Sequence, residues 1–112
     1  MISLTARRLL SASSLGRPDA AKTALFLCDM QEFFRGNISH YDEIVETSRH
    51  VKEMAQLLDM PIIVTEQYPK GLGHTVPELD ASQYVVCEKT KFSMWTDEVA
   101  EKMKTEHPHV DS

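Results

Sequence analysis

The sequence is poor in cysteine and has no long apolar run. Its 112 residues include two cysteines, Cys28 and Cys87, which lie far apart rather than in a C-x-x-C spacing. Such a pair offers neither a disulfide framework nor a zinc site. Each cysteine lies in an apolar segment that predicts a strand, so we expect two reduced, structural thiols. No apolar stretch approaches the length needed to cross a bilayer, which predicts a soluble protein with no membrane association.

Positive charge is also scarce. The chain has 12 Lys and Arg residues against 17 Asp and Glu residues, a formal net charge of -5 and a pI of about 5.5. Because binding to phosphates requires clustered Lys and Arg, we do not expect nucleic acid or an anionic membrane as a partner. With 42% hydrophobic and 26% charged residues, the composition is that of a globular protein, and the length allows one domain.

The basic residues are unevenly distributed. Residues 1–18 contain three of them and no acid, so the remainder has nine basic and 17 acidic residues and a net charge of -8. A basic, serine-containing segment with apolar positions along one helical face resembles a mitochondrial transit peptide, and a disordered N-terminus of a cytosolic protein is the alternative. We therefore divide the chain into a leader, 1–20, and a domain, 21–112, and expect a mitochondrial or cytoplasmic location.

Apolar patterns predict an α/β domain. Residues 24–28 show no polar alternation, which is expected of a parallel strand covered on both faces. Residues 41–58 have apolar positions at helical spacing, and Ser39 with Asp42 makes a capping box for this helix. Residues 61–65 form a β-branched strand, so strand, helix and strand together predict a right-handed βαβ unit.

The rest of the chain continues this pattern. Residues 67–75 contain one proline and two glycines and predict an ordered loop after the second strand. Residues 84–88 predict a third strand. Thr96 can cap a final helix that packs through Val99 and Met103.

Three strands make only a small sheet. A doubly wound sheet places its first strand in the middle and adds strands from the second half of the chain on the other side. Residues 24–28 lack the charges and prolines that protect an edge strand. We therefore interpret the chain as the N-terminal part of a doubly wound, Rossmann-like parallel sheet that is truncated after residue 112. A compact three-stranded domain that is complete as written is the alternative.

Polar side chains follow each predicted strand, namely Asp29, Glu66 with Gln67, and Lys89. Ligands bind beyond the carboxyl ends of parallel strands, so these groups are expected to converge. Burial would raise the pKa of Asp29 and suit it to proton transfer, whereas a nearby Lys favours the carboxylate and stabilises developing anions. A turn-forming role for Asp29, and a solvated charge at Lys89 with Lys91 as its competitor, are the structural alternatives.

Three segments match a recognisable set of motifs: LCDMQEFFR at 27–35, TEQYPKGLG at 65–73 and KTKFSM at 89–94. In this order and spacing they resemble the isochorismatase-like hydrolases, in particular the isochorismatase domain-containing proteins of animals. The similarity runs from about Thr23 to the C-terminus. It implies a doubly wound α/β domain with a six-stranded parallel sheet.

The resemblance also implies roles for individual residues. Amidases of the family use an Asp, Lys and Cys triad, in which Asp29 would accept and donate the proton and Lys89 would favour the thiolate. Gln67 corresponds to a position that contacts substrate in some relatives, and we add Phe34 and Tyr68 as candidate substrate contacts. The sequence departs from close relatives at the residue before Phe34, where phenylalanine replaces a frequent lysine.

The third member of that triad has no counterpart. In the family the nucleophilic cysteine follows the fourth strand at the start of a helix, where its pKa is lowered, and the chain ends before that point. Cys28 alternates to the other side of its strand from Asp29, and Cys87 lies inside the third strand, so neither is expected to replace it.

No metal or other cofactor is expected. In the nicotinamidase branch an Asp and two His residues hold a divalent metal near the second strand, where this sequence has only His74. His107 and His109 have a ligand-like spacing, but on a proline-interrupted tail we expect them to be solvent-exposed.

Two classes of function follow. In the first, the full-length form cleaves a small amide or related substrate through a thioester, and the chain as given is inactive without its cysteine. A variant is isochorismatase proper, in which Asp29 would act as general acid on a vinyl ether. In the second, the chain is a non-catalytic interaction or regulatory protein. It would then form a homo-oligomer or pair with a homologue by strand addition at the first strand.

Overall fold

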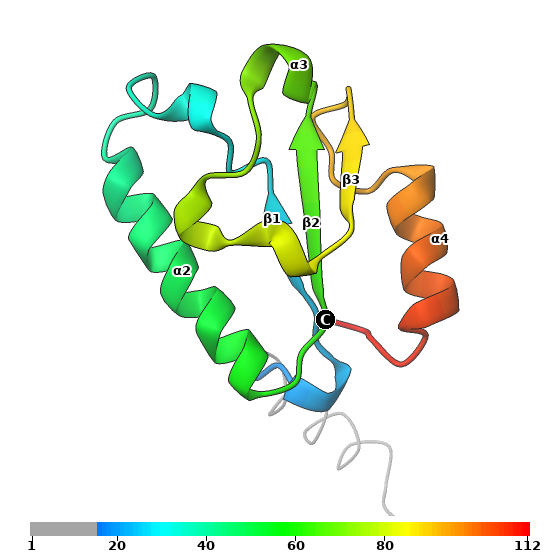
Figure 1. The fold of residues 1–112 in the computed structure, drawn as a ribbon. Helices are drawn as coiled ribbons and strands as arrows, with labels where there is room; N and C mark the ends of the chain where they lie inside the picture. Colours follow the sequence, from blue (N-terminus) through cyan, green and yellow to red (C-terminus); the bar gives the residue numbers. More distant parts are fainter. Residues whose placement is uncertain (1–15) are drawn as a thin grey trace, which may run out of the picture.

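The computed structural model describes residues 16–112 as a parallel sheet with helices on both faces (Figure 1). Three strands lie in the order β1-β2-β3: β1 (Leu25–Cys28), β2 (Ile62–Gln67) and β3 (Val86–Lys89). The helix α2 (Tyr41–Leu57) covers one face and α4 (Asp97–Glu106) covers the other. The predicted α/β class is confirmed. The expected leader lies mostly in residues 1–15, outside the described residues.

Short helical turns connect these elements. They are η1 (Ala20–Lys22), η2 (Glu32–Phe34), α3 (Pro69–Leu72), η3 (Pro77–Leu79) and η4 (Ala81–Gln83). The predicted loop after the second strand therefore contains one helical turn, α3. No helix within residues 16–112 is long and apolar enough to span a membrane.

The apolar strands are buried between the two helical layers. Leu27 and Val64 pack on the α2 side with Ala55, whereas Ile63 packs on the α4 side with Val99. Because successive side chains of a strand point to opposite faces, both faces of β2 must be apolar, as its continuous hydrophobic sequence indicates. β2 is the central strand and β1 lies at an edge, so no strand of residues 16–112 fills the place expected on the other side of β1.

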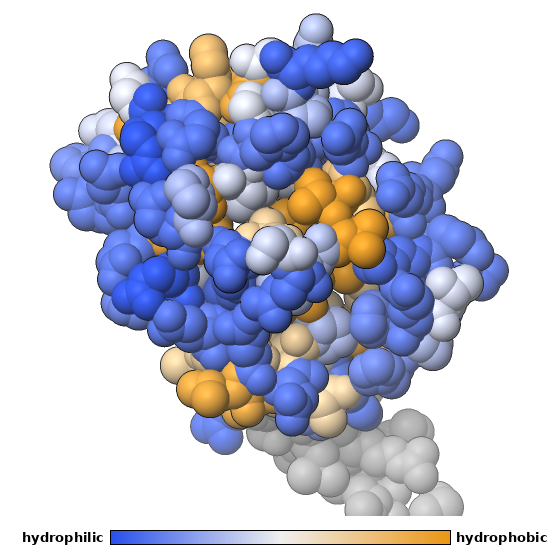
Figure 2. Space-filling view, viewed as in Figure 1, coloured by the Kyte–Doolittle hydropathy of each residue, from blue (hydrophilic) through white to orange (hydrophobic). Residues whose placement is uncertain are grey.

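The helix α2 differs from its prediction at both its start and its exposed face. It begins at Tyr41 after His40, which has a left-handed backbone (φ 59°), and Ser39 does not cap it. Several of the apolar residues that defined its periodicity are exposed, and orange atoms gather over its C-terminal end in Figure 2. These exposed residues are Ile44, Val51, Met54 and Leu58, and their neighbour Leu57 is exposed as well. Periodicity identified the helix correctly but assigned too wide a face to the core.

A lysine occupies part of the buried face of α2 instead. Lys52 is buried, and its Nζ donates to the carbonyl of Asp80 at 3.2 Å and lies 5.7 Å from the ring centroid of Tyr84. Its aliphatic stem covers apolar surface while the ammonium reaches polar partners. At the other helix, the predicted cap is confirmed: the Thr96 hydroxyl accepts a hydrogen bond from the Val99 amide.

The two cysteines are free, but their burial differs. Cys87 is buried in the core, as expected, whereas Cys28 at the end of β1 is exposed. The prediction of a buried Cys28 was wrong because its side chain lies at the carboxyl end of β1 beside Asp29 and Thr65, outside the apolar clusters on either face of the sheet.

Candidate functional site

Asp29 and Lys89 meet at the carboxyl edge of the sheet, as their positions after β1 and at the end of β3 predicted. The Lys89 Nζ lies 2.6 Å from the Asp29 Oδ2, and the two side chains are 2% and 12% exposed. Thr65 of the intervening strand donates its hydroxyl to the Asp29 Oδ1 at 2.8 Å. The alternative of a solvated Lys89 is therefore wrong.

Lys89 uses its whole hydrogen-bonding capacity at this site. Besides Asp29, its Nζ donates to the carbonyls of Lys91 at 2.7 Å and Phe92 at 3.2 Å. An ammonium group has three N–H donors, and the three acceptors match them. Lys89 therefore fixes the turn after β3 against the Asp29 carboxylate, while the predicted competitor Lys91 supplies a carbonyl.

Asp29 has an unusual backbone. Its φ is 53°, a left-handed conformation that costs most side chains energy but is tolerated by Asp and Asn. Its carbonyl accepts a hydrogen bond from the Gln31 amide at 2.9 Å, so Asp29 also turns the chain away from β1. The turn-forming and charge-bearing interpretations of Asp29 are thus compatible.

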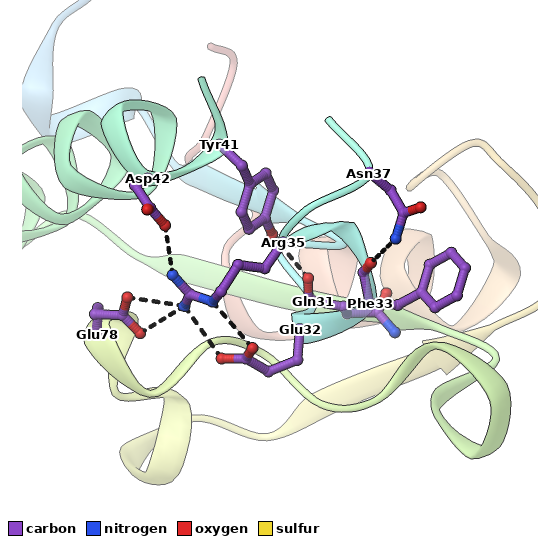
Figure 3. A network of polar contacts seen from close by, with 8 residues as sticks. All are labelled: Gln31, Glu32, Phe33, Arg35, Asn37, Tyr41, Asp42 and Glu78. Carbon is purple, nitrogen blue, oxygen red and sulfur yellow. Dashed lines mark hydrogen bonds and ion pairs between the residues drawn. The ribbon is translucent and has the colours of Figure 1, made fainter. Parts of the chain in front are cut away.

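Gln31 connects the loop after β2 to the end of β1. Its side chain is fully buried; Nε2 donates to the carbonyls of Gln67 at 2.9 Å and Gly73 at 2.8 Å, and Oε1 accepts from the Gln67 amide at 2.7 Å. Its carbonyl accepts the Tyr41 hydroxyl at 2.9 Å (Figure 3). Sequence reasoning missed this role. The available signal was an amide side chain directly after a buried strand, since an amide can both donate to and accept from one backbone segment.

Arg35 forms ion pairs with three neighbouring segments (Figure 3). Its guanidinium contacts carboxylates of η2, α2 and η3, namely Glu32 at 3.1 Å, Asp42 at 2.6 Å and Glu78 at 2.8 Å. Hydrogen bonds from Glu32 and then Glu78 raise the pKa of Arg35. Single exposed ion pairs contribute little, but several carboxylates around one planar guanidinium form a network that fixes geometry. Arg35 therefore holds the loop that follows Asp29 and Gln31.

Glu66 does not join the Asp29–Lys89 pair, although it was expected at the same edge. It follows Thr65, so its side chain points to the opposite face of the sheet. There the buried carboxylate accepts hydrogen bonds from the His74 Nδ1 at 2.9 Å and from the Thr75 amide and hydroxyl at 2.7 and 2.8 Å. Glu66 is thus an anchor for the loop after β2.

These contacts shift the ionisation of both partners. Burial raises the pKa of Glu66, but the hydrogen bonds from His74 and Thr75 outweigh it, so the pKa lies below its ordinary 4.5. The hydrogen bond to Glu66, and then its charge, raise the pKa of His74 above 6.5. His74 is largely exposed, which makes the pair accessible to solvent protons.

The Glu66–His74 pair predicts a stability that depends on pH. With a lowered pKa, Glu66 contributes above 4.5 and loses its contribution as the pH falls through that lowered pKa. With a raised pKa, His74 contributes fully below 6.5 and loses its contribution as the pH rises through that raised pKa. We therefore expect the pair to stabilise the fold most between pH 4.5 and 6.5.

The replacement His74→Gln tests this expectation. Urea unfolding should show a larger loss of stability at about pH 5.5 than at about pH 8.5, because a smaller fraction of the wild-type histidine is charged at the higher pH. His109→Gln, at an exposed position of the C-terminal segment, should show no such difference. An equal effect of His74→Gln at both pH values would contradict the pairing.

The three predicted substrate contacts lie in different surroundings. Gln67 pairs in register with Lys89 and donates its Nε2 to the Thr90 carbonyl at 3.3 Å. Tyr68 is half exposed, and its amide donates to the Lys89 carbonyl at 2.9 Å. Phe34 packs instead against a separate cluster between α2 and η3. The structure thus brings Gln67 and Tyr68 beside Lys89 and places Phe34 in that cluster; substrate contact stays a prediction for all three.

Comparison with known proteins identifies the family. The model of the isochorismatase domain matches residues 23–108. The chain belongs to the isochorismatase family. Isochorismatase domain-containing protein 2 of Xenopus laevis is 46% identical to it over 95 residues, which cover 85% of this chain and 46% of the relative. The human protein of the same name is 49% identical over 81 residues, which cover 72% of this chain and 40% of the human protein.

Two solved structures are also similar to this chain. One from Caenorhabditis elegans, named MAR1 ribonuclease, matches with a TM-score of 0.72 and 46% identity and covers 79% of this chain and 47% of its own. A hypothetical protein from Trypanosoma cruzi matches with a TM-score of 0.68 and 34% identity. The match covers 80% of this chain and 47% of that protein. The chain therefore spans about half the length of the relatives it matches.

Neither cysteine of this isochorismatase-family chain has the properties of a nucleophile. Partial burial, and then the neighbouring Asp29 charge, raise the pKa of the Cys28 thiol. Burial and then Glu98 raise the pKa of Cys87. A reactive thiol needs a lowered pKa, so both cysteines lack this property.

Metal ligands do not gather in the described part of the family domain. Among residues 16–112, no group of three or more His, Cys, Asp and Glu side chains is placed to hold a metal ion. A site without a metal or other cofactor stays a prediction. Of the two tail histidines, His109 is exposed and His107 is partly buried.

Proposed function

We propose that residues 16–112 carry the acid–base half of a hydrolytic site for a small amide or a related substrate. The observation that carries this proposal is the buried ion pair of Asp29 and Lys89, 2.6 Å apart at the carboxyl edge of a parallel sheet. This edge is where α/β folds bind ligands. Burying two charges is costly, and a paired carboxylate at such an edge is a candidate for proton transfer. Membership of the isochorismatase family supports the same assignment.

In this proposal each residue of the ion pair has a role in the hydrolysis. Asp29 accepts hydrogen bonds from Thr65 and Lys89, and its remaining lone pairs can take the proton of an attacking thiol. The thiolate forms a bond to the substrate carbonyl carbon, and the C–N bond then breaks as Asp29 returns the proton to the leaving amine. Water hydrolyses the thioester in a second round. Lys89 keeps Asp29 in place and offsets the negative charge that develops.

The nucleophile in this scheme is a cysteine outside the described residues. We propose that the full-length form supplies it, and that the 112-residue chain alone does not turn over amides. The resemblance to isochorismatase proper, with Asp29 as general acid on a vinyl ether, remains the variant that needs no thiol.

A chimera tests the proposal. Residues 1–112 would be fused to the part of the Xenopus laevis relative that follows the matched region, and ammonia release would be measured on a panel of small amides. We expect Asp29→Asn to lower kcat by about 100-fold or more, as is usual for loss of a general acid–base. Asp59→Asn, at an exposed aspartate with a similar backbone (φ 55°), is the matched control and should leave the rate unchanged.

Two results would count against this function. A chimera in which Asp29→Asn retains full activity would remove Asp29 from the chemistry. A folded chimera that is inactive on every amide would exclude amides as the substrate class.

The name of the C. elegans neighbour supports a second candidate, cleavage of RNA. The net charge of -5 disfavours a polyanionic substrate, because phosphate contacts need clustered positive charge. An RNA oligonucleotide in the same assay distinguishes the two: its cleavage by the chimera, lost in Asp29→Asn, would support the ribonuclease.

A further inference from the structure

The hydroxyl of Thr65 is a second donor to the Asp29 carboxylate. Thr65 Oγ1 donates to Asp29 Oδ1 at 2.8 Å, whereas Lys89 Nζ donates to the other oxygen, Oδ2, at 2.6 Å. A hydroxyl has one proton, so this hydrogen bond uses it. Each carboxylate oxygen therefore receives a hydrogen bond from a different strand, Oδ1 from β2 and Oδ2 from β3.

Thr65 lies at the centre of the sheet. It belongs to β2, which pairs with β1 on one side and β3 on the other, and it is fully buried. A β-branched side chain has few χ1 rotamers, so the strand fixes the position of the Thr65 Oγ1. The Thr65 carbonyl also accepts the Asp29 amide at 3.2 Å. Thr65 thus contacts both the backbone and the carboxylate of Asp29.

Asp29 needs this support because its own backbone does not continue the strand. It follows Cys28, the last residue of β1, and its φ of 53° is left-handed, so the pleat of β1 does not set the direction of its side chain. The terminal torsion of an aspartate is also broad. A carboxylate held at both oxygens cannot turn about that torsion without breaking a hydrogen bond, so Thr65 and Lys89 together define its plane.

The two donors make the two oxygens of Asp29 unequal. A proton added at Oδ2 would lie next to the ammonium of Lys89, which repels it, whereas the donor at Oδ1 is a neutral hydroxyl. Oδ1 keeps a lone pair beside the Thr65 hydrogen bond. We infer that Thr65 is a positioning residue, which fixes the Asp29 carboxylate and makes Oδ1 the oxygen that takes and returns the proton. This inference rests on the proposed function.

The proton balance of this step is simple. The S–H bond of the attacking thiol breaks as an O–H bond forms at Oδ1, and the electron pair stays on sulfur. The new O–H bond then breaks as the proton passes to the leaving nitrogen. Thr65 and Lys89 keep their own protons through both transfers.

The chimera described above tests the positioning role. Thr65→Val removes the hydroxyl at nearly the same volume and should lower kcat about tenfold or more, with KM changed less than about twofold. Thr65→Ser keeps a hydroxyl and should recover most of kcat. Thr75→Val is the matched control, because the Thr75 hydroxyl also donates to a buried carboxylate at 2.8 Å, that of Glu66. It should change kcat less than about twofold.

NMR of the 112-residue chain gives a readout that does not depend on catalysis. The chemical shift of a carboxyl carbon responds to hydrogen bonds at its oxygens. Thr65→Val should therefore move the Asp29 carboxyl signal and leave that of Glu66 in place, and Thr75→Val should do the reverse. Circular dichroism of each variant confirms that it folds. If Thr65→Val does not fold, Thr65→Cys takes its place, since a thiol is only a weak donor.

The outcomes separate this inference from the proposed function. An unchanged kcat in Thr65→Val, or an equal loss in Thr65→Val and Thr75→Val, would overturn the positioning role while the loss in Asp29→Asn still supports the chemistry. Full activity in Asp29→Asn would overturn both. If the chimera turns over no amide, the proposed function fails and NMR decides: an Asp29 signal that does not move in Thr65→Val overturns the positioning role.

Discussion

Asp29→Asn is expected to destabilise the fold by about 3–5 kcal/mol, the usual cost of removing one partner from a buried ion pair. The Lys89 side chain is only 2% exposed, so its ammonium would remain buried without an opposite charge. Asparagine tolerates the left-handed backbone of Asp29, so the loss reports on charge rather than strain. Urea unfolding followed by far-UV circular dichroism measures it.

The control for this variant is Asp59→Asn. Asp59 is exposed and has nearly the same φ, 55° against 53°, so its replacement should cost less than about 0.5 kcal/mol. The double variant Asp29→Asn with Lys89→Met leaves no unpaired charge and should be more stable than Asp29→Asn alone. The free energies of unfolding lost in Asp29→Asn and in Lys89→Met, each measured alone, are compared with the loss in the double variant. If the two single losses add up to the double loss, the ion pair has no coupling energy and the interpretation of the site is wrong.

Gln31→Met is expected to cost about 3 kcal/mol or more. Methionine has a similar shape, but it leaves the Gln67 amide and the carbonyls of Gln67 and Gly73 without their partner. Each buried group left unsatisfied costs about 1–3 kcal/mol. Because Gln31 is fully buried, water cannot easily replace the lost hydrogen bonds. Thermal and urea unfolding give the loss of stability.

Hydrogen exchange locates the effect of this variant. The amides of the loop after β2, in particular Gln67, should exchange faster in Gln31→Met, whereas amides of α4 should change only with global stability. Gln83→Met, at an exposed glutamine of η4, is the matched control and should leave both stability and exchange unchanged. Unchanged protection at Gln67 in Gln31→Met would show that Gln31 does not hold the loop.

The prediction of the fold succeeded where burial dominates. Residues 24–28 and 61–65 were recognised as strands because a strand covered on both faces needs apolar side chains at every position. The same rule placed Asp29 and Lys89 together, since the carboxyl ends of parallel strands share one edge. The two residues are 60 positions apart and still meet at 2.6 Å.

The prediction of individual contacts failed where a side chain's partner lies on a distant segment or depends on the local backbone conformation. Ser39 was expected to cap α2, but the N-cap position is occupied by His40, which has a left-handed backbone. The buried Lys52 was not foreseen, because its partners, Asp80 and Tyr84, lie about 30 residues further along the chain. Glu66 was grouped with Asp29, but the left-handed backbone of Asp29 turns its carboxylate towards Thr65 and away from the face that Glu66 shares with Val64.

The sequence by itself determined the βαβ unit, the family and the meeting of Asp29 with Lys89, because these depend on patterns that a chain carries locally and on the geometry of any parallel sheet. Only the tertiary structure decided that Lys89 uses all its donors on Asp29 and two carbonyls, and that Gln31 fixes the loop after β2. It also decided that β1 lies at an edge of the sheet formed by residues 16–112. Hydrogen bonds and burial between distant segments depend on three-dimensional register, which no local pattern encodes.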